Sequence, residues 1–127
     1  MPRVSSAFFT VAALCGLTGM VWGSWMGASG DHSLHPAHAH LNLLGWVTLS
    51  IMGGFYALPG APRAGTLAWV NFGLSTLGAI VMGALLPQVL MEKLPGKVMM
   101  TAEVPTILGM ICFLISVIST GRKPAAA

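Results

Sequence analysis

Long apolar runs separated by short polar connections make up almost the whole chain. The runs cover residues 4–26, 38–58, 65–86 and 99–120. Each is long enough to cross the hydrocarbon core of a bilayer, which takes about 20 residues of α-helix. Short connections favour antiparallel neighbours. The pattern therefore predicts an all-α membrane protein, a single domain over residues 1–127 with four transmembrane helices.

Composition agrees with this class, because only 7% of the residues are charged. The net charge of +3 comes from scattered basic residues that form no stripe for nucleic acid. The positive-inside rule places one group of them in the cytoplasm and the other outside. The inside group is Arg3, Arg63, Arg122 and Lys123, and the outside group is Lys93 and Lys97. We therefore expect a bacterial cytoplasmic membrane protein with both termini in the cytoplasm.

The first run carries small residues along one side and tryptophans near its outer end. The glycines in it and just after it are Gly16, Gly19, Gly23 and Gly27, and the last three form a stripe because they are spaced by four residues. Such a stripe allows a neighbouring helix to approach closely. Trp22 and Trp25 are typical of a membrane interface, and they are also candidates to flank a cofactor.

Three other residue types in the apolar runs have an expected role. Cys15 and Cys112 have no metal-type spacing and are expected to be small packing residues. Asn71 is expected to form a hydrogen bond between helices. Glu103 is an acid inside an apolar run, at the same expected membrane depth as the histidines. It is a candidate to bond an imidazole, to bind a proton, or to reach the interface.

All four histidines lie at or just before the start of the second run. They are His32, His35, His38 and His40. On a helix, His38 and His40 are separated by about 200°, so the two rings cannot hold one metal ion from both sides. A six-coordinate haem takes its two axial ligands from two different segments.

Three sources of the second ligand are open. A loop histidine could fold back, or a second copy of the chain could bring its own helix. The third source is a methionine, with Met20, Met26, Met99 and Met100 as candidates. A second copy uses the opposite directions of His38 and His40 best.

The second run resembles the histidine-bearing helices of the haem–copper oxidase catalytic subunit. His38-Ala39-His40, Gly45 and the sequence Ile-Met-Gly-Gly-Phe at 51–55 are similar to its tenth helix. There the first histidine binds the high-spin haem and the second the low-spin haem. His40-x-Asn42, with Gly53 and Tyr56, resembles the second helix of the nitric oxide reductase and cbb3-type branches.

This resemblance implies a fold and a cofactor. The family subunit has twelve helices in a pseudo-threefold arrangement, so a chain of four implies a homotrimer, with haem held between copies. The histidines that bind copper in that family lie on two further helices, and no other helix of this chain has a histidine. Oxygen reduction is therefore doubtful, and whether the chain is an enzyme stays open.

The leading hypothesis is a membrane b-type cytochrome for electron transfer, with His38 and His40 of neighbouring copies as iron ligands. The residues expected around the haem are Trp22, Trp25, Asn42, Gly45 and Glu103. A quinol or another redox protein is the expected partner class. The alternatives are a five-coordinate haem that binds or reduces oxygen or nitric oxide, a copper or zinc site made by the four histidines, and a structural subunit without a cofactor.

Overall fold

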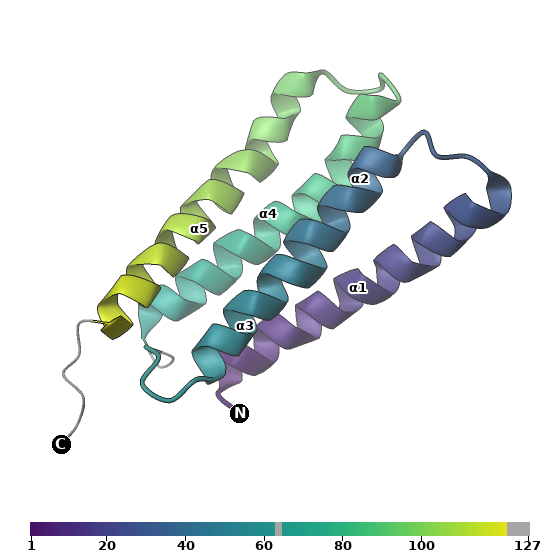
Figure 1. Ribbon diagram of the computed structural model, residues 1–127. Helices are drawn as coiled ribbons and strands as arrows, with labels where there is room; N and C mark the ends of the chain where they lie inside the picture. The colour runs from purple at the N-terminus through teal and green to yellow at the C-terminus, as the bar shows by residue number, and fades with distance from the viewer. Residues whose placement is uncertain (63–64, 122–127) are drawn as a thin grey trace.

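The computed structural model describes residues 1–62 and 65–121, and every regular element in them is helical (Figure 1). The elements are α1 (Arg3–Ser29), α2 (His35–His40), η1 (Leu41–Thr48), α3 (Leu49–Ala57), α4 (Thr66–Leu90), η2 (Gly96–Met99) and α5 (Met100–Gly121). α2, η1 and α3 follow one another without a break and form one continuous rod, which we call the α2–α3 rod.

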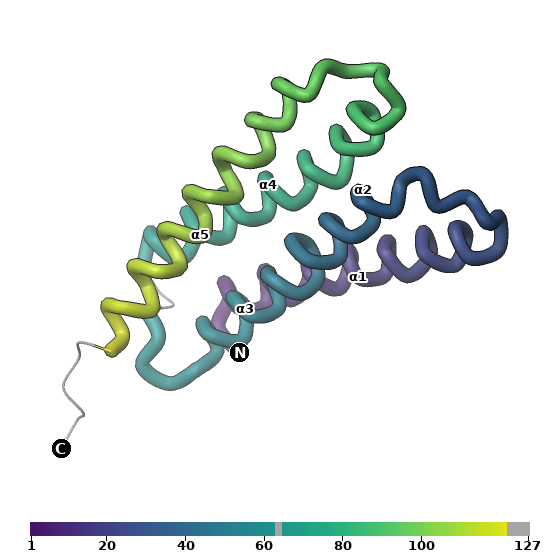
Figure 2. The backbone as a smooth tube through the Cα atoms, turned by 45° about the horizontal axis from the view of Figure 1, so that its top comes forward, coloured from purple at the N-terminus to yellow at the C-terminus, as the bar shows by residue number. Residues whose placement is uncertain are grey.

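The helices alternate in direction and form two hairpins (Figures 1 and 2). α1 pairs with the α2–α3 rod, α4 pairs with α5, and the hairpins meet mainly where α4 packs on η1 and α2. Within the described residues, three helical segments are long and apolar enough to cross a membrane, namely Arg3–Ser29, Thr66–Leu90 and Gly96–Gly121. The prediction of an all-helical chain with membrane-spanning character is confirmed to this extent, and the fourth predicted span, residues 38–58, is not among these three segments.

The helix ends differ from the predicted ones by a few residues. α1 continues past residue 26 to Ser29, where Gly30 adopts φ 71° and donates its N–H to the carbonyl of Met26 at 3.0 Å. That left-handed conformation suits glycine at a helix C-terminus. α4 continues past residue 86 to Leu90 because Pro87 lies in the last turn, where it removes only one backbone hydrogen bond.

The expectation of a uniform α-helix over 38–58 needs a correction. Residues Leu41–Thr48 form a π-helix, in which each turn holds more residues than in an α-helix. The side chain of Thr48 follows this wider turn, because its hydroxyl donates to the carbonyl of Leu43, five positions earlier, at 2.8 Å. Segments of this kind are rare and often occur at functional sites.

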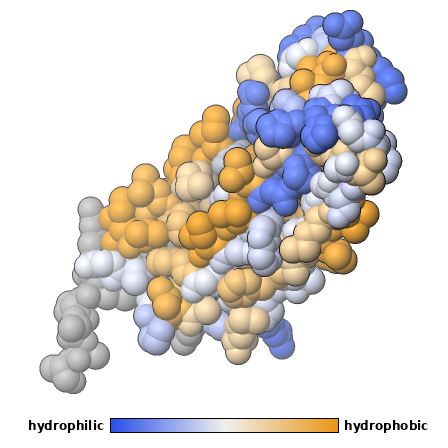
Figure 3. All heavy atoms as spheres, turned by 45° about the vertical axis from the view of Figure 1, so that its right-hand side comes forward, coloured by the Kyte–Doolittle hydropathy of each residue, from blue (hydrophilic) through white to orange (hydrophobic). Residues whose placement is uncertain are grey.

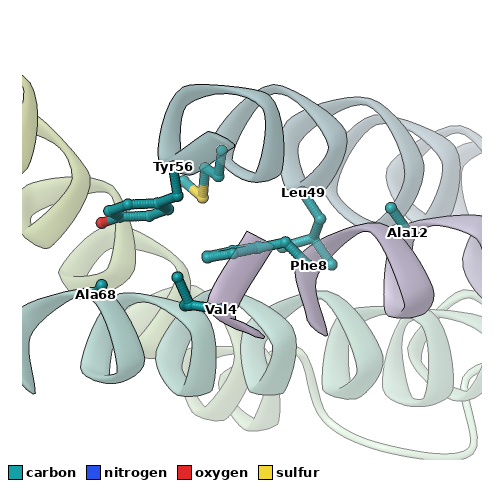
Figure 4. Packing of buried hydrophobic residues seen from close by; sticks show 7 residues of the cluster. Val4, Phe8, Ala12, Leu49, Tyr56 and Ala68 are labelled. Atoms are coloured by element: carbon teal, nitrogen blue, oxygen red, sulfur yellow. The ribbon is translucent and has the colours of Figure 1, made fainter. Parts of the chain in front are cut away.

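The main core lies at the end of the bundle that holds the N-terminus, which we call the N-terminal end. Phe8 stacks on Tyr56 with ring centres 5.6 Å apart, and Leu49 and Val4 pack beside them (Figure 4). A smaller cluster joins α4 to α5 nearer the other end, around Met82 and Met99. Because α2 starts at this other end, we call it the histidine end.

The surface at the histidine end differs from the surface along the sides of the helices. Hydrophilic atoms gather at the histidine end, around the connections 30–34 and 91–95, and apolar atoms cover much of the helix sides (Figure 3). α5 exposes large apolar side chains along most of its length, including Met100, Ile107 and Leu114. Such a surface suits contact with lipid. The predicted topology also used Arg63, Arg122 and Lys123, which lie outside the described residues.

Candidate functional site

His38 points from α2 into the contact with α1. Its Nε2 lies 3.0 Å from the carbonyl oxygen of Gly19, and its ring meets the indole of Trp22 edge-on, with centres 5.9 Å apart. The imidazole is half-buried. Because a carbonyl oxygen only accepts, Nε2 must carry the proton in this contact, which leaves the lone pair of a neutral ring on Nδ1.

His40 has the opposite arrangement, on the exposed side of α2. Its Nδ1 lies 2.7 Å from the carbonyl oxygen of Pro36, one turn earlier on the same helix. Nδ1 therefore donates, and Nε2 of the neutral ring carries the lone pair on an exposed side chain. Histidines that bind metals commonly hold their second ring nitrogen in this way, with a backbone carbonyl fixing the tautomer.

The two rings thus face different surroundings, as the predicted separation of about 200° requires. His38 faces α1, whereas His40 is exposed. The spacing alone does not indicate which ring is directed inwards. The structure answers this point and makes the pair unequal as ligands, since only His40 leaves Nε2 uncommitted.

A row of side chains on the rod sits against the glycines of α1. A β-carbon added at Gly23 would lie 3.1 Å from Nε2 of His38, and one added at Gly16 would lie 3.0 Å from the indole of Trp46. Between them, a β-carbon at Gly19 would overlap the amide of Asn42. We call Gly16, Gly19 and Gly23 the glycine row, and His38, Asn42 and Trp46 the facing row.

The predicted glycine stripe therefore receives side chains rather than a helix backbone. Gly27 does not take part, since a β-carbon there would meet nothing within 4 Å among the described residues. The π-helix explains how the facing row stays aligned. At the α-helical twist of 100° per residue, Trp46 would be turned by about 80° from His38, and the wider π turn reduces this drift.

Asn42 and Gly45 were predicted to line a cofactor, and both lie in the contact with α1. The amide Nδ2 of Asn42 donates to the carbonyl of His38 at 2.9 Å. A β-carbon at Gly45 would lie 2.7 Å from Cβ of Cys15, so glycine is required for this close approach. Cys15 is buried there, as expected for a packing residue.

The other predicted residues are spread over the surface. Trp25 is 53% exposed. It borders a hollow of about 600 Å³ on the outside of α1, which Trp22 also lines. Glu103 is exposed in the first turn of α5, where the helix dipole favours a carboxylate. Glu103 belongs to α5, which packs on α4, whereas His38 faces α1.

The remaining histidines do not complete a metal site within one chain. His32 and His35 are exposed, and Nδ1 of His32 lies 3.0 Å from the carbonyl of Gly30. Over residues 1–62 and 65–121, no group of three or more His, Cys, Asp or Glu side chains is placed to hold a metal ion.

Sequence reasoning missed two features of this site. One is the role of Pro36, whose carbonyl fixes the His40 ring, and the other is Trp46 in the facing row. The four-residue spacing of positions 38, 42 and 46, set against glycines at 16, 19 and 23, was the available signal. Comparisons of the chain with protein-family models, with curated proteins and with solved structures found no match.

Proposed function

We propose that this chain is a membrane b-type cytochrome that binds haem on the side of α2 where His40 is exposed. The single observation that supports this best is the state of His40, whose Nδ1 is held by the Pro36 carbonyl at 2.7 Å while Nε2 is free to bind iron. Resemblance of residues 38–56 to the histidine-bearing helices of haem–copper oxidases adds the type of cofactor.

The surroundings of His40 fit a porphyrin. Leu43, Val47 and Ile51 follow it along the rod, and all three are exposed and apolar. Such side chains suit the faces of a large flat ring, and a neutral imidazole suits its iron. When bound, haem would supply a one-electron carrier, and the chain's own part would be to hold and orient it.

We further propose that haem lies between copies of the chain, in a homotrimer within the cytoplasmic membrane and with both termini in the cytoplasm. An exposed imidazole beside exposed apolar side chains describes half of a site, which a neighbouring copy can complete. A quinol or another redox protein is the partner class that fits electron transfer. Native mass spectrometry of the purified protein tests the trimer, and a monomer with bound haem would contradict it.

The test of the function is the visible spectrum of the protein purified from membranes, with haem and metals quantified per chain. We expect a Soret band, and we expect His40→Ala to remove most of the haem. His32→Ala is the matched control, because it removes an exposed imidazole at the same end of the bundle. An unchanged haem content in His40→Ala would contradict the assignment of His40 as the iron ligand. Stoichiometric copper or zinc without a Soret band would contradict the proposed function.

A second candidate is a five-coordinate haem that binds oxygen or nitric oxide. The observation that favours it is the contact of His38 with Gly19, because it commits Nε2 of the second histidine to a backbone carbonyl. Carbon monoxide added to the reduced protein distinguishes the candidates. A prompt spectral change supports the open iron site, and an unchanged spectrum supports two strong axial ligands.

A further inference from the structure

We infer that His38 is a positioning residue, which fixes the α2–α3 rod on α1 and so directs His40 outwards, and that it does not bind the iron. The inference rests on the proposed function for the role of His40, and it leaves an exposed methionine of a neighbouring copy, Met20 or Met100, as the source of a second axial ligand. The part that concerns His38 itself rests only on contacts within the chain, and it can be tested on protein without haem.

The imidazole of His38 is held by α1 on several sides. Its Nε2–H donates to the carbonyl of Gly19 at 3.0 Å, and the indole of Trp22 meets the ring at an interplanar angle of 88°. Gly23 supplies the space, since a β-carbon there would lie 3.1 Å from Nε2. A carbonyl oxygen has two lone pairs, so Gly19 can accept this bond in addition to its helical one.

Asn42 strengthens the same contact one turn further along the rod. Its Nδ2 donates to the backbone carbonyl of His38 at 2.9 Å, and its side-chain amide fills the space left by the missing side chain of Gly19. Gly19 therefore takes a hydrogen bond from His38 and a packing contact from Asn42. Together these contacts fix both the rotation and the height of α2 against α1.

This rotation decides where His40 points. With His38 directed at α1, the helical twist of about 200° over two residues places His40 on the opposite side of α2. The Pro36 carbonyl then sets the ring so that Nε2 is available. If His38 used Nε2 to bind iron, it would have to leave Gly19, and the contact that directs His40 would be lost.

Glutamine at position 38 separates the two roles. Its amide N–H can donate to the Gly19 carbonyl from a reach similar to that of imidazole Nε2, but an amide nitrogen has no lone pair for iron. We expect His38→Gln to keep the haem content and the Soret band of the original protein. Unfolding temperatures are compared on haem-free protein, because a bound ligand itself stabilises the folded state. We expect His38→Ala to lower both this temperature and the haem content, and His40→Gln to lose haem while its haem-free form keeps the unfolding temperature.

The opposite pattern would overturn the inference. If His38→Gln lost haem as completely as His40→Gln, with the unfolding temperature of both haem-free proteins unchanged, then His38 would be an iron ligand. The inference would also be contradicted if His38→Gln and His38→Ala had equal unfolding temperatures, both below that of the original protein. The N–H donor that glutamine supplies would then have recovered no stability.

A measurement on haem-free protein keeps the inference distinct from the proposed function. Nitrogen-15 NMR of the histidine rings reports the tautomer, and we expect the proton on Nε2 for His38 and on Nδ1 for His40. Gly23→Ala should disturb the His38 signal, because its new methyl group reaches Nε2, and Gly27→Ala should not. A His38 proton on Nδ1 would overturn the inference. Absence of haem from the purified protein would end only the proposed function.

Discussion

The phenol oxygen of Tyr56 lies 3.0 Å from the hydroxyl of Ser116, a residue sixty positions further along the chain. Asn71 donates its Nδ2 to the same phenol at 3.0 Å, and Ser75 donates to Oδ1 of Asn71 at 2.9 Å. The hydroxyl of Ser116 is committed to the carbonyl of Cys112, so Tyr56 is the donor between them. These four buried side chains join α3, α4 and α5, and every hydrogen bond runs in one direction.

Replacing Tyr56 by Phe should therefore destabilise the bundle while leaving its shape nearly unchanged. The phenol oxygen is removed, and the amide of Asn71 is left buried without its acceptor. A buried polar group without a partner costs about 1–3 kcal/mol. Equilibrium unfolding in detergent measures the loss. Ser119→Ala is the control, since that hydroxyl bonds only within its own exposed turn of α5; an equal loss in both variants would contradict the network.

The glycine row gives a second prediction, with a control on the same helix. Gly19→Ala should lower the stability of the α1 contact, because the new methyl group overlaps the amide of Asn42 and must displace it. Gly27→Ala meets nothing among the described residues and should stabilise α1 by roughly 0.5–1 kcal/mol through helix propensity. Thermal unfolding of both variants tests the difference. Two variants of equal stability would show that Asn42 is not seated on Gly19.

The helical spans could be predicted because length and apolar content decide them locally. The π-helix could not, because the residues around Gly45 are mostly apolar and carry no local signal for a wider turn. Its register depends on the fit of Trp46 and Asn42 against α1, which is a tertiary contact. The predicted end of the third run at residue 86 was wrong because a proline in the last turn of a helix is tolerated, so that α4 continues to Leu90.

The residue types of the candidate site could be predicted from the sequence, but the directions of their side chains could not. Spacing places His38 and His40 on opposite sides, but the choice between them depends on the carbonyl of Gly19 on another helix. The hydrogen bond expected of Asn71 is confirmed, and its acceptor, Tyr56, is a residue whose own role the sequence left open. Such pairings need the packing of three helices, which no single run of sequence contains.

The connection between α1 and α2 provides a prediction on pH. The backbone N–H of Ser33 donates to the carboxylate of Asp31 at 3.0 Å, and this bond holds the pKa of Asp31 below its ordinary value of 3.8. A carboxyl whose folded pKa is lowered contributes its stability above the unfolded pKa and loses it as the pH falls through the folded pKa. The amide signal of Ser33 should therefore titrate below pH 3.8. In Asp31→Asn it should not titrate, and a transition that persists there would assign it to another group.

The contact of Gly45 with Cys15 offers a reciprocal test of how closely the π-helix approaches α1. Gly45→Ala should be destabilising, because its β-carbon would lie 2.7 Å from Cβ of Cys15. Adding Cys15→Gly removes that atom and should recover part of the loss, whereas Cys15→Gly alone should be destabilising through the space it leaves. A double-mutant cycle by equilibrium unfolding gives the coupling, expected at about 0.5–3 kcal/mol for residues in contact. Gly54→Ala is the control within the same rod, since its methyl group meets nothing in the described part of the chain. If the effects of Gly45→Ala and Cys15→Gly were strictly additive, the helices would be further apart than this contact requires.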